Sequence, residues 1–217
     1  MQTNRPDKIM ILGSSNLARE VAWLISDINL KKPNTWKILG FWDGQETSPG
    51  RSINNVPVIG LDVIKTQTSD LYAIAAIGDP GIRQRAVQQA FELGCPFATL
   101  IHPSVHFDPQ TTTIGQGSII CAGSVISVNV SIGSHVVVNW NCTIGHDSTI
   151  DNFVTLSPGC HLSGYSGINR GSYIGAGAVI IEKHSIGENS VIGAGAVVTT
   201  DIPANVTAVG IPARTKK

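Results

Sequence analysis

The stretch that decides the fold runs from residue 144 to residue 179 and divides into groups of six: IGHDST, IDNFVT, LSPGCH, LSGYSG, INRGSY and IGAGAV. Each group opens on an aliphatic residue, and the spacing continues in both directions without an insertion. It holds at 15 successive positions: Ile114, Ile120, Ile126, Ile132, Val138, Ile144, Ile150, Leu156, Leu162, Ile168, Ile174, Ile180, Ile186, Ile192 and Val198. The next residue is Gly, Asn, Asp or Ser in 12 of the 15 groups, and the fifth is Ser, Ala, Val or Cys in 13.

A period of six fits neither an α-helix nor separate hairpins, and it predicts a short strand followed by a corner. Three groups make one coil of a triangular prism, so 15 groups predict a parallel β-helix of about five coils. The aliphatic residue points inward, and small or polar residues accept the unusual backbone of the corner. Residues 18 apart then stack at the strand spacing of about 4.8 Å, which places Ile144 against Leu162 and Cys142 against Cys160.

Residues 1–102 have a different pattern, which predicts a Rossmann-like α/β domain before the all-β region of residues 103–217. Apolar strands are expected at residues 8–13, 38–42, 71–78 and 97–101, with amphipathic helices at residues 17–28 and 82–91 between them. The boundary is expected near His102 and Pro103.

A candidate nucleotide site follows from the first strand of this domain. Gly13, Ser14 and Ser15 stand between strand and helix, where a doubly wound fold places a phosphate against the helix N-terminus. Asp43 ends the second strand, where a carboxylate accepts a hydrogen bond from a ribose hydroxyl, and Gly78 ends the third. Since only one glycine of the usual fingerprint is present, a plain turn and helix cap is the alternative interpretation.

Composition limits the partners. Lys and Arg number 15, as do Asp and Glu, so the formal net charge is zero, which argues against a nucleic-acid partner. Charged residues make up 14%, against about 25% in an average domain, and this favours burial between subunits. No apolar run approaches the roughly 18 residues of a membrane span, and the first residues lack an apolar signal core. We therefore expect a cytoplasmic protein with no membrane partner.

Both halves together resemble the hexapeptide-repeat sugar acetyltransferases of bacterial glycan biosynthesis, a family that includes sialic acid O-acetyltransferases and nucleotide-amino-sugar N-acetyltransferases. The motifs that carry the resemblance are Ile11-Leu12-Gly13, Ala18-Arg19-Glu20-Val21, Gly40-Phe41-Trp42-Asp43, Ala76-Ile77-Gly78-Asp79, Ile82-Arg83, Leu100-Ile101-His102-Pro103-Ser104, Gly145-His146-Asp147 and Val209-Gly210-Ile211-Pro212-Ala213-Arg214. The resemblance implies a left-handed β-helix, a homotrimer, a nucleotide sugar in the first domain and acetyl-CoA between neighbouring subunits. The chain departs from the family at Ser15-Asn16-Leu17, where Gly-Gly-His is usual.

Acetyl transfer from a thioester requires a base, and histidine has the appropriate basicity near neutral pH. Among six histidines, His146 alone has an acid beside it within the repeat, and an adjacent carboxylate fixes the tautomer of an imidazole. His184 is expected inside the prism, and His135 and His161 outside. The resemblance implies that His146 is the base, that Asp147 supports it, and that the N–H of Gly164 faces the thioester oxygen. Ala176 and Ala194 are expected beside the pantetheine arm.

Other interpretations stay open at this stage. A non-catalytic β-helix scaffold or binding protein is the main alternative. A γ-type carbonic anhydrase shares the fold, but the spacings of the histidines do not match its zinc ligands, and no CxxC pair is present. We therefore expect no metal. The sequence does not decide between nitrogen and oxygen as the acetylated atom, nor between UDP-, GDP- and CMP-linked sugars.

Overall fold

The computed structural model describes residues 6–44, 50–66 and 70–216. Contacts divide the chain into two compact units, one of Met1–Gly78 with Ile82–Pro103 and the other of Asp79–Gly81 with Ser104–Lys217. In the described ranges, no helix is at once long and apolar enough to cross a bilayer.

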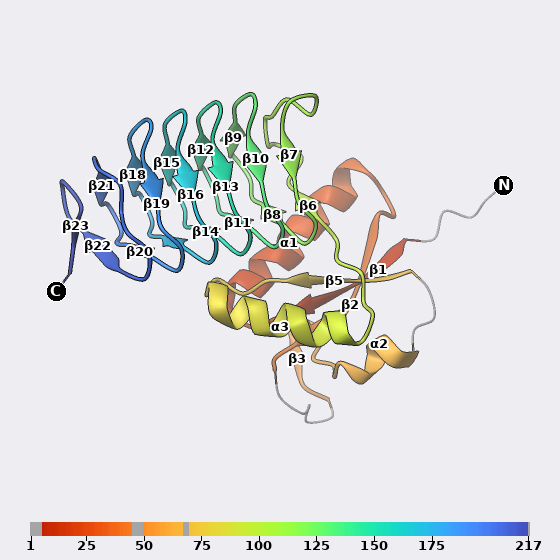
Figure 1. Ribbon diagram of the computed structural model, residues 1–217. Helices are drawn as coiled ribbons and strands as arrows, with labels where there is room; N and C mark the ends of the chain where they lie inside the picture. The colour runs from red at the N-terminus through yellow and green to blue at the C-terminus, as the bar shows by residue number, and fades with distance from the viewer. Residues whose placement is uncertain (1–5, 45–49, 67–69, 217) are drawn as a thin grey trace. The chain divides into compact units, whose positions relative to one another are not determined.

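The first unit is built on a parallel sheet of order β2-β1-β5, formed by β1 (Asp7–Leu12), β2 (Trp36–Trp42) and β5 (Leu71–Ala75). Helices α1 (Asn16–Lys31) and α3 (Pro80–Glu92) lie on opposite faces of this sheet (Figure 1). The smaller elements are β3 (Ser52–Ile53), β4 (Val56–Pro57), α2 (Asp62–Thr66) and β6 (Leu100–Ile101). The predicted Rossmann-like α/β fold is confirmed.

The apolar run of β1 explains why helices cover both faces of this sheet. Residues Ile9 to Leu12 are all fully buried, so side chains pointing to either face need a covering layer. In α1 the buried positions are Leu17, Ala18, Val21, Leu24 and Ile25, which follow helical spacing. The carboxyl ends of β1, β2 and β5 meet at one edge, and this edge positions the first candidate site.

The second unit is a parallel β-helix of five complete coils with the beginning of a further coil (Figure 1). Its fifteen two-residue strands are β7 (Thr113–Ile114), β8 (Ile119–Ile120), β9 (Val125–Ile126), β10 (Ser131–Ile132), β11 (Val137–Val138), β12 (Thr143–Ile144), β13 (Thr149–Ile150), β14 (Thr155–Leu156), β15 (His161–Leu162), β16 (Gly167–Ile168), β17 (Tyr173–Ile174), β18 (Val179–Ile180), β19 (Ser185–Ile186), β20 (Val191–Ile192) and β21 (Val197–Val198). Every third strand belongs to the same sheet. At the C-terminal end β22 (Thr207–Val209) pairs with β20 and, antiparallel, with β23 (Arg214–Thr215). The predicted β-helix is confirmed.

The register of the coils follows the hexad spacing. Ile144 pairs with Ile126 on one side and with Leu162 on the other, so the aliphatic residues form columns along the axis. Ile144 is 2% exposed and Leu162 is 3% exposed. Because each coil is hydrogen-bonded to the next through parallel strands, the sequence period fixes which side chains lie above one another.

Buried serines explain the small polar residue at the fifth position of many groups. The Ser124 hydroxyl donates to the carbonyl of Asn139 at 2.9 Å and accepts from the N–H of Cys142 at 3.3 Å. Ser172 does the same with the carbonyl of Gly187 and the N–H of Ser190. A corner breaks the strand ladder, so its backbone groups need other partners, and these hydroxyls supply them.

Candidate functional site

The catalytic candidate lies at the corner between β12 and β13. Three residues one coil apart occupy this corner in the left-handed backbone region: Asn129 with φ 57°, Asp147 with φ 57° and Tyr165 with φ 58°. The N–H of Tyr165 donates to the carbonyl of His146 at 2.9 Å, and the N–H of Asp147 donates to that of Val128 at 3.1 Å. These backbone bonds hold the three side chains in one column.

His146 and Asp147 are hydrogen-bonded to each other at this corner. Nδ1 of His146 lies 2.8 Å from Oδ2 of Asp147, and Nδ2 of Asn129 donates to Oδ1 of Asp147 at 3.0 Å. These hydrogen bonds, first from His146 and then from Asn129, hold the pKa of Asp147 below its ordinary value. Asp147 therefore stays ionised at neutral pH. Since a carboxylate only accepts hydrogen bonds, Nδ1 carries a proton and Nε2 of the neutral ring is left as the acceptor.

Gly164 lies beside the ring of His146, one coil further along. A Cβ atom added to Gly164 would lie 2.7 Å from both Cε1 and Nε2 of His146. The carbonyl of Gly164 accepts from the N–H of Lys183 at 3.1 Å. Within the described part of the chain, the N–H of Gly164 has no hydrogen-bond partner. Gly164 and the imidazole of His146 thus lie side by side, and acyl transfer requires a base near a donor for the developing oxyanion.

His146 is accessible from solvent. Its side chain is 52% exposed and that of Asp147 is 32% exposed. The ring of Tyr165 packs against that of His146 with the centroids 5.2 Å apart and the planes at 88°. Asp147 and Tyr165 restrain the orientation of the imidazole, and Asn129 in turn holds Asp147.

Ala176 and Ala194 lie at a different edge of the prism from His146. They occupy the corners between β17 and β18 and between β20 and β21, whereas His146 occupies the corner between β12 and β13. The neighbouring glycines, Gly177 and Gly195, have nothing within 4 Å of an added Cβ, so this edge is open. The structure therefore brings Gly164 to the base, and it does not bring Ala176 or Ala194 there within one chain.

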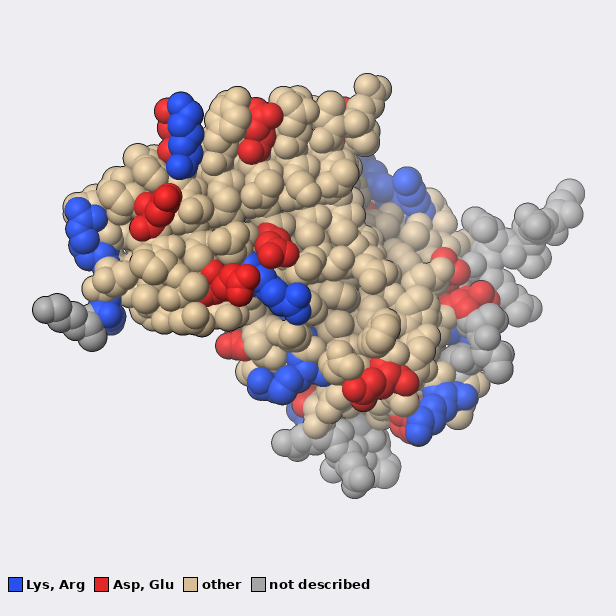
Figure 2. Space-filling view, viewed as in Figure 1, with Lys and Arg blue, Asp and Glu red and all other residues tan. Residues whose placement is uncertain are grey.

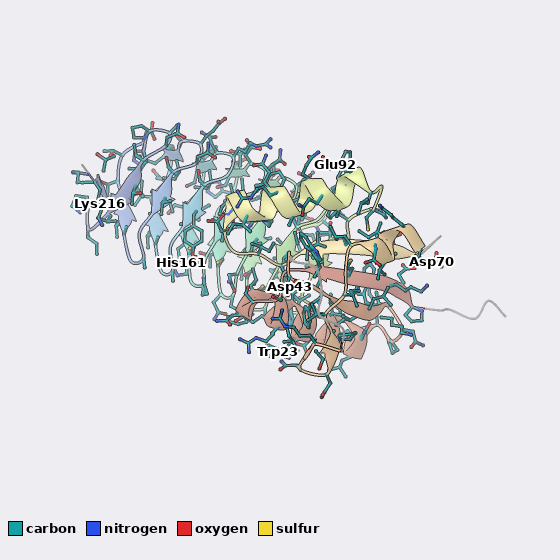
Figure 3. All side chains as sticks on the ribbon, turned by 90° about the horizontal axis from the view of Figure 1, so that it is seen from below. Trp23, Asp43, Asp70, Glu92, His161 and Lys216 are labelled. Atoms are coloured by element: carbon teal, nitrogen blue, oxygen red, sulfur yellow. The ribbon has the colours of Figure 1, made fainter. Side chains whose placement is uncertain are left out.

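The second candidate site is a cavity of about 240 Å³ in the first unit, at the carboxyl ends of β1, β2 and β5. Its lining consists of Gly13, Trp42, Asp43, Gly44, Ile77, Ile82, Arg85, Ala86 and Gln89. Gly13 and Asp43 were predicted here from the sequence, and Asp43 is labelled in Figure 3. Ser14 and Gly78 are next to lining residues and Ser15 is two positions from Gly13, but none of the three lines the cavity.

Two features shape this cavity. At Gly13 the backbone has φ 117°, and an added Cβ would lie 2.8 Å from the carbonyl oxygen of Ala76, so only glycine fits. Arg83 is fully buried and donates to the carbonyls of Ile77 and Gly78 at 2.6 and 3.1 Å. These contacts fix the loop after β5. The carboxylate of Asp43, with a side chain only 9% exposed, forms an ion pair with Arg51.

Sequence reasoning missed Arg85 and Gln89. Both are exposed residues of α3, and they line the cavity together with Ile82 and Ala86. The signal that could have found them is their helical spacing from Ile82, which places all four on one face. The cavity thus presents an arginine, a carboxylate, an amide and an indole, which are groups suited to phosphate, ribose and base.

The remaining histidines correct two expectations. His135, expected outside, is only 6% exposed because its ring stacks on Phe153 with centroids 5.0 Å apart. His184, expected in the core, has a side chain 26% exposed and lies 3.2 Å from Oδ1 of Asp201, since β19 is the last strand of its sheet. His161 is exposed as expected (Figure 3). Over the described residues, no group of three or more His, Cys, Asp and Glu is placed to hold a metal ion.

The amino-acid sequence is similar to a known protein family and to a named acetyltransferase. Residues 8–90 match the family described as the PglD N-terminal domain. Over 214 residues the chain is 33% identical to the GDP-perosamine N-acetyltransferase of Escherichia coli O157:H7, and the match covers 95% of each protein.

Two solved structures are similar along almost the whole chain. The acetyltransferase domain of PglB from Neisseria gonorrhoeae FA1090, in complex with acetyl coenzyme A, has a TM-score of 0.87 and 32% identity over 97% of this chain and 100% of that one. PerB from Caulobacter crescentus, in complex with CoA and GDP-perosamine, has a TM-score of 0.87 and 27% identity over 97% of both.

Proposed function

The chain belongs to the hexapeptide-repeat sugar acetyltransferases that carry a PglD N-terminal domain, and from this membership we propose that it transfers the acetyl group of acetyl-CoA to the amino group of a nucleotide-linked sugar. The observation that carries the proposal is the site itself, in which Nδ1 of His146 is bound to Asp147 at 2.8 Å while Nε2 lies beside Gly164. Relatives named as N-acetyltransferases favour nitrogen over oxygen as the acetylated atom.

His146 acts as the general base. Its Nε2 accepts a proton from the sugar amine as the nitrogen attacks the thioester carbonyl, and the C–N bond forms while the carbonyl oxygen gains negative charge. The N–H of Gly164 donates to this oxyanion. When the C–S bond breaks, the imidazolium of His146 returns the proton to the sulfur of CoA. Asp147 stabilises the imidazolium during the interval in which it carries the charge.

The cavity of the first unit binds the nucleotide part of the acceptor. Arg85 supplies positive charge for the diphosphate, and Asp43 accepts hydrogen bonds from the ribose. The indole of Trp42 offers an apolar surface for the base. Support for this assignment comes from the PglD N-terminal match over residues 8–90 and from the complex of PerB with GDP-perosamine.

We propose that the active enzyme is a homotrimer with acetyl-CoA bound between subunits. The repeat from residue 114 to 203 contains only seven charged residues, which are Asp147, Asp151, Arg170, Glu182, Lys183, Glu188 and Asp201. Figure 2 shows that charged side chains are few over the face of the β-helix in view. A β-helix face with so few charges is suited to burial against another subunit. Identical subunits that associate in this way commonly form a closed ring with cyclic symmetry. Ala176 and Ala194 of one subunit then line the pantetheine arm that serves His146 of the next.

A complementation experiment tests the shared site. His146→Ala and Ala194→Trp are each expected to be inactive as pure proteins, the first through loss of the base and the second through blockage of the CoA groove. Mixed trimers contain interfaces that have both intact halves, so co-expression should restore activity. Absence of restored activity in trimers of proven mixed composition, or a monomeric mass by light scattering at micromolar concentration, would contradict this arrangement.

A cytoplasmic location is part of the proposal. All four cysteines, Cys95, Cys121, Cys142 and Cys160, are buried free thiols, which is typical of proteins of a reducing compartment.

Release of CoA thiol, measured with a panel of nucleotide-linked amino sugars and free sialic acids, tests the reaction. We expect turnover with amino sugars and none with sialic acid hydroxyls. His146→Ala should lower kcat by about 10²–10⁴-fold and leave the Kd of acetyl-CoA unchanged, because the imidazole acts on the acceptor's proton. A variant that keeps more than about a tenth of the wild-type kcat would remove His146 from the role of base.

A further inference from the structure

The carboxylate of Asp147 is contacted from the coil on either side of its own. Asn129, one coil before, donates from Nδ2 to Oδ1 of Asp147 at 3.0 Å. Side-chain hydrogen bonds from His146, Asn129 and Tyr165, in that order, lower the pKa of this carboxylate. Since an ionised carboxylate only accepts hydrogen bonds, the hydroxyl of Tyr165, one coil after, is a donor to Asp147. Two donors from opposite coils thus contact the group that binds His146.

Backbone hydrogen bonds fix both donor residues in place. The N–H of Asn129 donates to Oγ1 of Thr111 at 3.2 Å, one coil before it. The N–H of Tyr165 donates to the carbonyl of His146 at 2.9 Å, one coil before it. Because residues 18 apart lie above one another in the β-helix, the side chains of Asn129 and Tyr165 reach Asp147 from opposite sides.

Tyr165 contacts both members of the His146–Asp147 pair. Its hydroxyl binds Asp147, and its ring packs against the imidazole of His146 with the centroids 5.2 Å apart and the planes at 88°. Burial in the core does not account for these contacts, because Tyr165 is 55% exposed. The side chain therefore acts on the pair itself, at the Nδ1 side of the imidazole where Asp147 lies.

We propose that Tyr165 is a positioning residue that acts through Asp147, with its hydroxyl and the amide of Asn129 holding the carboxylate from opposite sides so that it stays on Nδ1 of His146. The effect on rate rests on the proposed function, since it takes His146 as the base. A carboxylate that turns away from Nδ1 leaves the ring able to adopt the other tautomer, in which Nε2 carries the proton and cannot accept one. Either donor alone still restrains the carboxylate, so removal of both should have the larger effect.

The first experiment measures the tautomer of His146 in the full-length protein without substrate. Nitrogen-15 NMR of histidine-labelled protein is recorded at alkaline pH, where the imidazole is neutral, and the signals that His146→Ala removes identify the ring. We expect the proton on Nδ1 in the wild type. The fraction with the proton on Nε2 should rise in Tyr165→Phe and rise further when Asn129→Gly is added. Tyr173→Phe is the matched control, because it removes the same atom from a tyrosine of β17, and it should leave this fraction unchanged.

The second experiment measures turnover of the same variants. Tyr165→Phe should lower kcat by about two- to ten-fold, as loss of one hydrogen bond implies, while the KM of both substrates and the melting temperature stay unchanged. The kcat loss in the variant that combines Tyr165→Phe with Asn129→Gly should exceed the product of the two single losses and approach that of Asp147→Asn. In the Asp147→Asn background, Tyr165→Phe should cause almost no further loss of rate.

Three results would overturn the proposal. An unchanged tautomer in the variant that lacks both donors would show that they do not hold the carboxylate on Nδ1. An equal loss of kcat from Tyr165→Phe in the wild type and in Asp147→Asn would give Tyr165 a role independent of Asp147. A raised KM for the acceptor with unchanged kcat would make Tyr165 a substrate-binding residue. Failure of the proposed function is recognised separately, by full activity of His146→Ala, because the tautomer is measured without substrate and tests Tyr165 by itself.

Discussion

Gly164 lies so close to the imidazole of His146 that an added Cβ would stand 2.7 Å from Nε2. Its backbone is not in the left-handed region, so alanine at this position is tolerated by the chain itself and conflicts only with the ring. The two residues belong to successive coils, so the orientation of the proposed base depends on the absence of a side chain one coil away.

Gly164→Ala should therefore disable the base without unfolding the β-helix. The methyl group displaces the imidazole, so kcat should fall by about 10²-fold or more with little change in melting temperature. Gly167→Ala is the control, since its Cβ would meet Ser185 at 3.5 Å, an ordinary contact. Steady-state kinetics and thermal melts of both variants test this prediction. A fully active Gly164→Ala protein would contradict the proposed role of Gly164 beside His146.

Asp147 is expected to act through His146. Asp147→Asn keeps the size and tolerates φ 57°, but it removes the charge that stabilises the imidazolium. The rate at neutral pH should drop, and the acidic limb of the rate profile should move to lower pH. In the His146→Ala background the Asp147→Asn change should cause almost no further loss of rate, because the two residues work as one unit. Losses that multiply in the double variant would give Asp147 an independent role.

Asn129 should affect the same pH profile more weakly. Asn129→Gly keeps a residue suited to the left-handed corner and removes the amide that donates to Asp147 at 3.0 Å. Because the Asp147 carboxylate is exposed to solvent, water replaces much of this hydrogen bond, so we expect a rate loss of about ten-fold or less. Asn189→Gly, at an equivalent corner elsewhere, should leave the profile unchanged, and a shift in that control would point to a general effect on the coil.

Asp43 should contribute to acceptor binding and not to chemistry. Asp43→Asn retains the size of the side chain while it weakens hydrogen bonds from ribose hydroxyls and the pairing with Arg51. The KM for the nucleotide sugar should rise by about ten-fold, with kcat and the KM for acetyl-CoA nearly constant. Isothermal titration with the free nucleoside diphosphate gives the same information without turnover, and unaltered affinity there would remove Asp43 from the site.

Asp201 gives a pH dependence of stability at the C-terminal end of the β-helix. Its carboxylate accepts from the N–H of Ser185 at 2.9 Å and lies 3.2 Å from Nδ1 of His184, and these contacts, in that order, hold its pKa below the ordinary 3.8. A carboxylate with a lowered pKa stabilises the fold above its unfolded pKa, and the contribution is lost as the pH falls through the folded value. The melting temperature of Asp201→Asn should thus be lower than that of the wild type at pH 7, and the difference between the two should become smaller toward pH 3. A gap independent of pH would refute the charge as its cause.

The fold could be predicted because the aliphatic period of the β-helix is local and uninterrupted from Ile114 to Val198. The position of Gly164 followed from the same arithmetic, and His146 was distinguished by the acid beside it. Asn129 and Tyr165 could have been found in the same way, since each lies one coil from Asp147. Arg85 and Gln89 were harder, because which face of α3 meets the strand ends is decided by tertiary packing. His184 was misplaced because its sheet ends at β19. The hexad pattern continues past this strand and does not indicate where the sheet ends.

The stacked coils also limit how the chain can change in length. Asn129, Asp147 and Tyr165 share a corner only because one turn separates each from the next. An insertion of a single residue between them rotates every later side chain out of its column, and an insertion of six moves the later residues to the next edge. Only an insertion of 18 residues, one whole turn, returns every later residue to its own column. If such an insertion falls between His146 and Gly164, it still separates these two residues. Length variation compatible with the proposed function therefore belongs beyond β21 (Val197–Val198), where added turns leave both the corner of His146 and the edge with Ala176 and Ala194 as they are.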